Sequence, residues 1–138
     1  MKIHIHLFFL SFFILTLAGC AATPPTQEEL ESADYGAPIS QQDAKRQATE
    51  FFQSHLRDPG SAQYRWTQVE RGWLRHAPIH GGRIVYGYKL DVDVNAKNAF
   101  GGYVGFRKYS FIFRNGKIET IYAEQDMGTG SLIMGRIR

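Results

Sequence analysis

The run RIVYGYKLDVDVN, residues 83–95, decides the fold because its apolar side chains recur at every second position. Strict alternation over this length is typical of a long strand that is buried on one side only. We therefore predict a strand over residues 83–95, in a sheet that needs a covering layer on its apolar face. That face would carry Ile84, Tyr86, Tyr88, Leu90, Val92 and Val94.

The strands that follow are predicted to form a hairpin. Residues 103–114 again have the composition of a strand, and Asn115-Gly116 is the strongest short hairpin signal, because both residues tolerate positive φ in a type I′ turn. Regular pairing around this turn would place Phe113 opposite Ile118 and Phe111 opposite Thr120. The turn therefore predicts the register of the two strands.

An amphipathic helix precedes the strands. Residues 41–57 carry apolar side chains at intervals of three and four, after Ser40 as the capping residue and before Pro59, which ends the helix. A short strand follows around residues 62–67, and residues 69–79 are less regular. Because an amphipathic helix and a one-faced sheet satisfy each other, the sequence predicts an α+β fold: one helix on an antiparallel sheet of three to five strands.

The N-terminal segment is typical of a cleaved targeting signal. Residues 1–19 have a basic start and an apolar run over residues 7–17 that is too short to span a membrane. Leu17-Ala18-Gly19-Cys20 resembles the lipobox of bacterial lipoproteins. The resemblance implies a signal peptide over residues 1–19, lipidation of Cys20, and an outer-membrane anchor that faces the periplasm. Ala21 supports the outer membrane, because Asp at that position would favour retention in the inner membrane.

Composition sets the remaining boundaries. Residues 20–40 combine the lipidated cysteine with a polar segment that we expect to be a flexible tether. Residues 41–125 form the small α+β domain, and residues 126–138 are expected to be a loosely ordered C-terminal tail. Within that tail, residues 132–134 either add an edge strand or pack over the helix. Two apolar residues of the tether are expected to dock on the domain, Tyr35 and Ile39.

The connection VNAKNAFGGYVGF, residues 94–106, has two interpretations. In the first it is structural: Asn side chains bond the backbone of their own turn and glycine supplies positive φ. In the second, Asn95, Lys97 and Asn98 are the polar groups of a ligand-binding or catalytic loop. The structural interpretation predicts that both Asn side chains bond backbone within the connection and that Gly101 or Gly102 has positive φ.

Metal and catalytic motifs are weak. Asp91-x-Asp93-x-Asn95 matches the start of a calcium loop but lacks the later Gly and Glu, so a polar strand face balanced by a cation such as Arg107 fits better. Pro78 interrupts any helix that would pair His76 with His80 on zinc. With Cys20 as the sole cysteine, no thiol chemistry is left. We expect no enzyme activity, no metal and no cofactor.

The charge distribution is uneven. Residues 21–43 carry five acids and no base, whereas residues 44–117 carry thirteen Lys or Arg and five acids. A basic domain on an acidic tether fits an anionic envelope component or an envelope protein as partner, besides the membrane reached through Cys20. Nucleic acid is not expected for an exported chain. The alternative to a specific partner is a basic surface that only keeps the domain in solution, or an acidic tether that folds back on the basic domain.

Two further stretches resemble a known group. LRDPGSAQYR at residues 56–65 and VNAKNAFGGYVG at residues 94–105 are similar, in this order, to small uncharacterised proteobacterial lipoproteins. That resemblance implies an exported domain and no particular activity. The resulting expectation is a non-enzymatic binding or accessory module of the cell envelope. The alternative is a small-molecule-binding or enzymatic domain that uses the loop 95–105.

Overall fold

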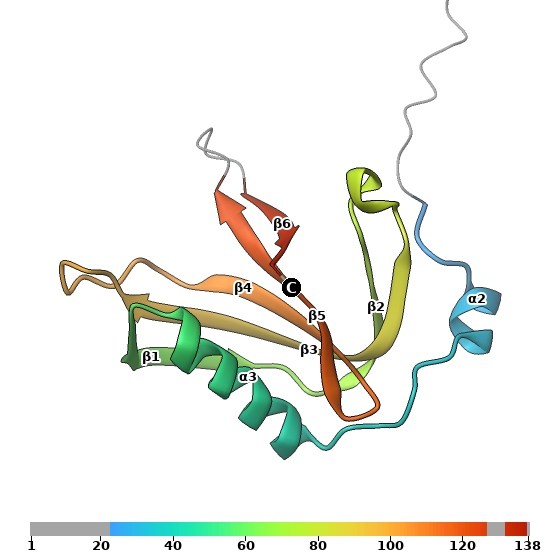
Figure 1. The fold of residues 1–138 in the computed structure, drawn as a ribbon, viewed down its shortest axis with the longest axis horizontal. Coiled ribbons are helices and arrows are strands. Elements are labelled where there is room, and N and C mark those ends of the chain that lie inside the picture. The colour runs from blue at the N-terminus through green and yellow to red at the C-terminus, as the bar shows by residue number, and fades with distance from the viewer. Residues whose placement is uncertain (1–22, 127–131, 138) are drawn as a thin grey trace, which may run out of the picture. The chain divides into compact units, whose positions relative to one another are not determined.

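The computed structural model describes residues 23–126 and 132–137, and the chain divides after Ser32 into two compact units. Within the first unit, helix α2 spans Gln27–Ser32. The second unit holds the sheet and a longer helix (Figure 1). Its elements are α3 (Gln41–His55), β1 (Asp58–Trp66), β2 (Glu70–Arg75), a 3-10 turn (Pro78–His80), β3 (Ile84–Lys97), β4 (Arg107–Arg114), β5 (Lys117–Asp126) and β6 (Leu132–Arg136).

The long strand β3 organises the sheet. Its C-terminal half pairs with β1 and its N-terminal half pairs with β2, both antiparallel and on the same edge, while β4 pairs along the other edge. The order β1-β3-β4-β5-β6, with β2 off this path, makes six strands. The predicted α+β class is therefore confirmed, but the sheet is larger than the three to five strands expected. Residues 132–136 of the expected tail supply one of the additional strands, β6.

Helix α3 covers one face of this sheet, and the two share the main core. The helix contributes Ala44, Ala48, Phe51 and Phe52, and Phe52 contacts the rings of Tyr109 and Phe111 edge-on. It ends at His55, two residues before the predicted end, because Leu56 already has extended backbone. The sheet residues of this core are Leu90, Val92, Val94, Phe111, Phe113 and Ile121.

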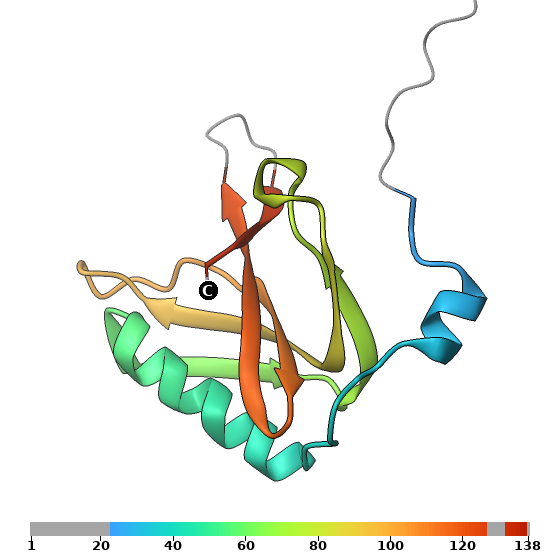
Figure 2. The same cartoon turned by 45° about the vertical axis from the view of Figure 1, so that its right-hand side comes forward.

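The sheet bends, so that β3 buries different faces along its length. Leu90, Val92 and Val94 are buried against α3. Val85 and Gly87, which lie on the opposite face of the strand, are buried nearer its N-terminal end. There Tyr122 of β5 donates a hydrogen bond from its hydroxyl to the carbonyl of Arg75 in β2, at 3.0 Å. In Figure 2 the upper end of β2 curves toward the side of the sheet on which β5 and β6 lie. The single covered face predicted from alternation is thus correct only for the C-terminal half of the strand.

The β4–β5 hairpin keeps the predicted turn but not the whole predicted register. Asn115 and Gly116 have φ of 50° and 76°, and Phe113 pairs with Ile118 as expected. Beyond that pair the register shifts, so that Phe111 lies opposite Ile121 and Ile112 opposite Thr120. The shift leaves Glu119 unpaired as a bulge. Its reason is apolar burial, because only the shifted register places Ile121 beside Phe111 in the core.

Some of the expected tether is built into the domain. Tyr35 is buried and meets the ring of Tyr86 edge-on, at 5.9 Å between centroids. The guanidinium of Arg114 donates to both the carboxylate and the carbonyl of Asp34, each at 2.7 Å. We call residues 33–39 the strap. The expected docking of Tyr35 is confirmed, and Ile39 packs against the core.

Two predictions fall on residues that the structure does not describe. The signal peptide over residues 1–19 and the lipidated Cys20 lie outside the described ranges. Within those ranges, none of the helices combines the length and the apolar character needed to cross a membrane.

Candidate functional site

The connection between β3 and β4 is held together by Asn98. The side-chain oxygen of Asn98 accepts hydrogen bonds from the amides of Phe100 and Gly102, at 2.9 and 3.1 Å. Its backbone closes the same turn, since the Asn98 amide donates to the carbonyl of Gly102 at 2.8 Å. Gly101 has φ of 80°, which favours glycine. The structural interpretation of this asparagine is confirmed.

Asn95 has the same role three residues earlier in the chain. Its side-chain oxygen accepts a hydrogen bond from the amide of Gly105 at 3.0 Å, and Gly105 has φ of 93°. The connection therefore folds back to the end of β3. Strand β4 begins only at Arg107, whereas the sequence predicted its start at residue 103. Both asparagines thus use their side-chain oxygens to shape the loop.

Lys97 is the member of the predicted trio whose charged group is not used to shape the backbone. Its amide donates to Ser61 Oγ at 2.9 Å, and its ammonium lies 5.6 Å from the centroid of the Tyr103 ring. The Tyr103 hydroxyl donates to the carbonyl of Ser61 at 3.2 Å, which ties the loop to β1. Among the described residues no carboxylate forms an ion pair with Lys97.

Large apolar side chains stand exposed on this connection. Phe100 is 96% exposed, Val104 52% and Tyr103 47%. In Figure 1 the connection projects past the end of α3 and β1. Single exposed apolar residues are ordinary on protein surfaces, but three within five residues of one projecting loop form a patch that suits a binding surface.

A pocket of about 200 Å³ opens beside this patch, where α3 ends. Three of its lining residues are cationic: Arg57 follows the helix, Lys97 ends β3, and Arg107 begins β4. The lining contains no Asp, Glu, His, Ser, Thr or Cys. The other residues that line it are Leu56, Val94, Ala96, Asn98, Val104 and Tyr109.

The sequence predicts Lys97 and Asn98 of this pocket as candidate site residues, but it does not predict Arg57 and Arg107. Arg107 was expected to balance Asp91 and Asp93, yet it pairs in register with Val94 on the helix side of the sheet. Asp91 instead has Lys89 at 2.9 Å and accepts a hydrogen bond from Ser110 Oγ at 2.6 Å. The excess of basic residues was the signal in the sequence, but only the topology brings these cations together.

A second groove, of about 420 Å³, lies between α3 and the β4–β5 turn. Most of its polar groups have partners in the protein. Gln47 donates to the carbonyl of Gly116 at 2.7 Å, and Glu50 pairs with Arg46 at 3.0 Å. The ring of His55 stacks on Phe51 and its Nδ1 lies 2.8 Å from the carbonyl of Phe51. These contacts belong to the packing of the helix on the hairpin.

The remaining titratable candidate is His76. It is 4% exposed, and its Nε2 has no hydrogen-bond partner. Burial lowers its pKa, and the positive charge of Arg136 lowers it further. His80 is exposed on the 3-10 turn. Within the described ranges no group of three or more His, Cys, Asp or Glu side chains is arranged to hold a metal.

Comparisons of the chain with protein-family models, with curated proteins and with solved structures found no match.

Proposed function

We propose that this chain is a lipoprotein, anchored through Cys20 in the outer membrane and facing the periplasm, and that its domain is a non-enzymatic binding module of the cell envelope. One observation supports the binding role. The β3–β4 connection exposes Phe100, Tyr103 and Val104 beside cations that have no carboxylate partner among the described residues. Aromatic and arginine side chains are enriched where proteins bind partners.

The direction of β4 supports this assignment. The β3–β4 connection precedes Arg107, and the strap is held by Arg114 at the other end of the same strand. A strand of eight residues is roughly 25 Å long. The chain that leads back toward Cys20 therefore leaves the domain at the end opposite to the exposed patch. The point at which that chain leaves the domain is thus separated from the patch by about the length of β4.

The composition of the pocket supports binding over catalysis. General acid–base and nucleophilic chemistry draws most often on imidazole, carboxylate, thiol or aliphatic hydroxyl groups placed at the reacting atoms, and only in some enzymes on an amine or a phenol. The lining offers guanidinium, ammonium, amide and a single phenol among apolar carbons. Such groups hold a ligand by charge and by burial. The small-molecule-binding alternative considered from the sequence is favoured by the same pocket, and the enzymatic alternative is not.

The anchor is tested by metabolic labelling. Cells that express the wild-type chain or Cys20→Ala are fed radiolabelled palmitate, and the protein is isolated from separated inner and outer membranes. We expect label in the wild-type chain, in the outer-membrane fraction, and none in the variant. Label that survives the substitution contradicts lipidation at Cys20.

The binding module is tested by crosslinking in intact envelopes. Wild type, Phe100→Ser and Lys117→Gln are compared, since Lys117 is a cation at the opposite end of the hairpin from the patch. We expect one set of crosslinked envelope components from wild type and Lys117→Gln, and its loss in Phe100→Ser. Equal crosslinking by all three chains would show that the patch is not the binding surface.

A further inference from the structure

We propose that the pocket bordered by Arg57, Lys97 and Arg107 is a binding site for a phosphate monoester that carries a short apolar group. The inference deepens the proposed binding function and rests on it, while it is independent of the anchor. The site is built where three elements converge: the end of α3, the end of β3 and the start of β4.

The charges of the pocket favour an anion. Three positive side chains share one lining, and no acid belongs to it. Asp58 lies opposite Lys97 in the strand pairing but forms no ion pair with it, and none of the ion pairs in the described ranges of the chain involves Arg57 or Arg107. Like charges held together raise the potential of a concave surface and attract counter-ions to it. A doubly charged anion compensates three cations better than a singly charged one does.

The chemistry of the donors points to phosphate oxygens. A guanidinium offers a fork of N–H donors that matches carboxylate and phosphate, and an ammonium binds phosphate as a point charge. Tyr109 adds a phenol to the lining, and burial raises the pKa of this phenol, so it stays protonated and remains a donor. Two guanidinium forks with an ammonium and a phenol exceed what a two-oxygen carboxylate accepts, but suit the three free oxygens of a phosphate monoester.

The rest of the lining is mostly aliphatic and favours an apolar group on the ligand. Val94 and Ala96 are buried on the helix side of β3, and Leu56 and Val104 complete an aliphatic wall. A volume of about 200 Å³ corresponds to roughly six or seven waters of liquid. That space holds a phosphate group with about four carbons, so a butyl chain is a matched probe. A longer chain would leave the pocket past Val104, which is half exposed.

The test measures ligand protection of the loop in the full-length chain. The chain is purified from membranes, placed in phosphatidylcholine nanodiscs and followed by hydrogen exchange of the amides of residues 95–107. Monobutyl phosphate is titrated in, with inorganic phosphate, butyrate and butylammonium as comparison probes. We expect monobutyl phosphate to slow exchange at about tenfold lower concentration than inorganic phosphate, because buried methylenes add affinity. We expect it to bind more tightly than butyrate, and butylammonium to have no effect.

Variants locate the effect. Arg57→Gln and Arg107→Gln should each raise the half-saturating concentration of monobutyl phosphate about tenfold, as loss of a charge-assisted hydrogen bond predicts. Lys117→Gln is the matched control and should leave it unchanged. Because these side chains are exposed, the thermal unfolding midpoint of every variant should match that of wild type. Equal protection by butylammonium, or an equal effect of Lys117→Gln, overturns the site.

Two further arms identify the ligand. Butyrate that binds as tightly as monobutyl phosphate overturns the assignment to phosphate. Nanodiscs that contain phosphatidic acid test for a lipid headgroup: loop protection without added probe shows a lipid source, and protection only by the added ester shows a soluble one. Either result supports the site. If no phosphate probe binds while Phe100→Ser still abolishes crosslinking, the pocket proposal fails and the binding module stands.

Discussion

At the scale of single residues, His76 is unusual because it is buried while its Nε2 has no partner. Its ring lies 6.2 Å from that of Tyr122 between centroids, and the charges that act on it come from Arg136, Arg83, His80 and Glu119. Burial and the neighbouring cations outweigh Glu119 and lower the pKa of His76 below 6.5. A proton on this ring therefore costs more in the folded chain than in the unfolded one.

We predict that stability falls as the pH drops through the region of about 6.5 and below, where the unfolded chain takes up a proton that folded His76 resists. Above that region the ring is neutral in both states and contributes no pH dependence. Urea unfolding at about pH 7.5 and about pH 5 measures the effect. His76→Phe should flatten the slope relative to wild type, and His80→Gln, which removes only one of the lesser causes of the lowered pKa, should keep most of it. A slope unchanged in His76→Phe would contradict the prediction.

A second residue-scale prediction concerns Gly87, where β3 and β4 approach closely. A Cβ added there would meet the carbonyl oxygen of Phe113 at 2.5 Å and a methyl of Ile112 at 2.6 Å. Gly87→Ala should lower the free energy of unfolding by about 2 kcal/mol or more, as overpacking does. Gly102→Ala is the control, since its nearest neighbour would be 3.8 Å away, and it should be nearly neutral. Equal midpoints in denaturant unfolding would refute this.

The residues of the site differ in how well the sequence predicts them. Asn95 and Asn98 could be predicted because a short amide beside glycines bonds its own loop, and each forms such a bond. Arg57 and Arg107 could not, because each alone is an ordinary surface cation far along the chain from the other. Their meeting depends on where α3 ends relative to β4, which is a property of packing and not of either local stretch.

At the scale of elements, the bulge at Glu119 decides which side chains of β5 enter the core. It turns Ile121 to the side of Phe111, and Ile121 is fully buried there, whereas Ile118 is only partly buried. Ile121→Ala should therefore cost about 3 kcal/mol in unfolding free energy and Ile118→Ala clearly less. Under the regular register Ile121 would lie outside this core, so equal costs in chemical denaturation would argue for that register instead.

Elements with a clean period were predicted well, and irregular ones were not. Helix α3 begins at the predicted residue because the apolar spacing and the Ser40 cap agree, and Ser40 Oγ accepts from the amide of Asp43 at 3.0 Å. Strand β2 was not predicted because Gly72 and two arginines stand within its six residues, so its side chains do not alternate between apolar and polar. Its pairing with β3 is seen only in the structure. The bulge has no local signal beyond the three-residue spacing of Ile118 and Ile121.

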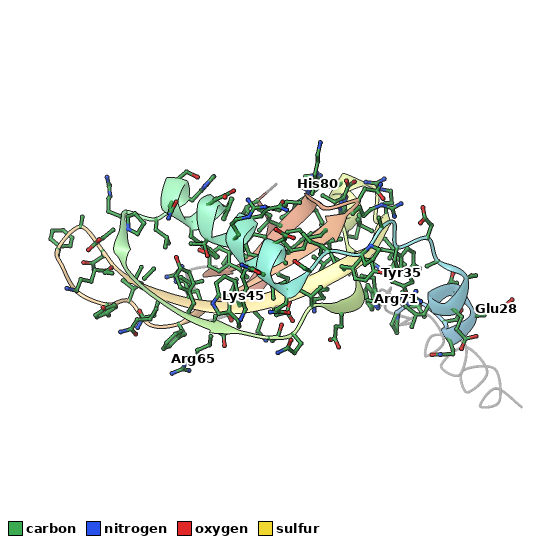
Figure 3. All side chains as sticks on the ribbon, turned by 90° about the horizontal axis from the view of Figure 1, so that it is seen from below. Glu28, Tyr35, Lys45, Arg65, Arg71 and His80 are labelled. Atoms are coloured by element: carbon green, nitrogen blue, oxygen red, sulfur yellow. The ribbon has the colours of Figure 1, made fainter. Side chains whose placement is uncertain are left out.

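At the scale of the whole domain, the strap fixes where the N-terminal chain leaves the fold. Arg114 holds Asp34, the amide of Ala37 donates to Asn115 Oδ1 at 2.9 Å, and Arg71 lies over the Tyr35 ring at 5.2 Å. Figure 3 shows Tyr35 and Arg71 next to each other at that end. The hydrogen bond from the Gly36 amide and the contact with Arg114 lower the pKa of Asp34, so its carboxylate stays charged.

We predict that Arg114→Ala releases the strap and leaves the rest of the domain folded. Hydrogen exchange of residues 34–37 should speed up about tenfold or more, while the amides of residues 98–105 at the other end should not change. Arg46→Ala, which removes exposed ion pairs on α3, is the control and should leave the strap protected. Exchange that rises at both ends after Arg114→Ala would show general unfolding instead of local release.

The position of β3 in the sheet also has a consequence for the order in which the chain folds. Both β1 and β2 are made before β3, yet neither pairs with the other, and each finds its partner only in β3. A chain that is synthesised from its N-terminus can form α3 early. It has no sheet to pack α3 against until β3 has been made, up to about residue 97. Such contacts between distant segments of a chain slow folding. If the chain is exported as we propose, this delay keeps it unfolded until it has passed through the membrane.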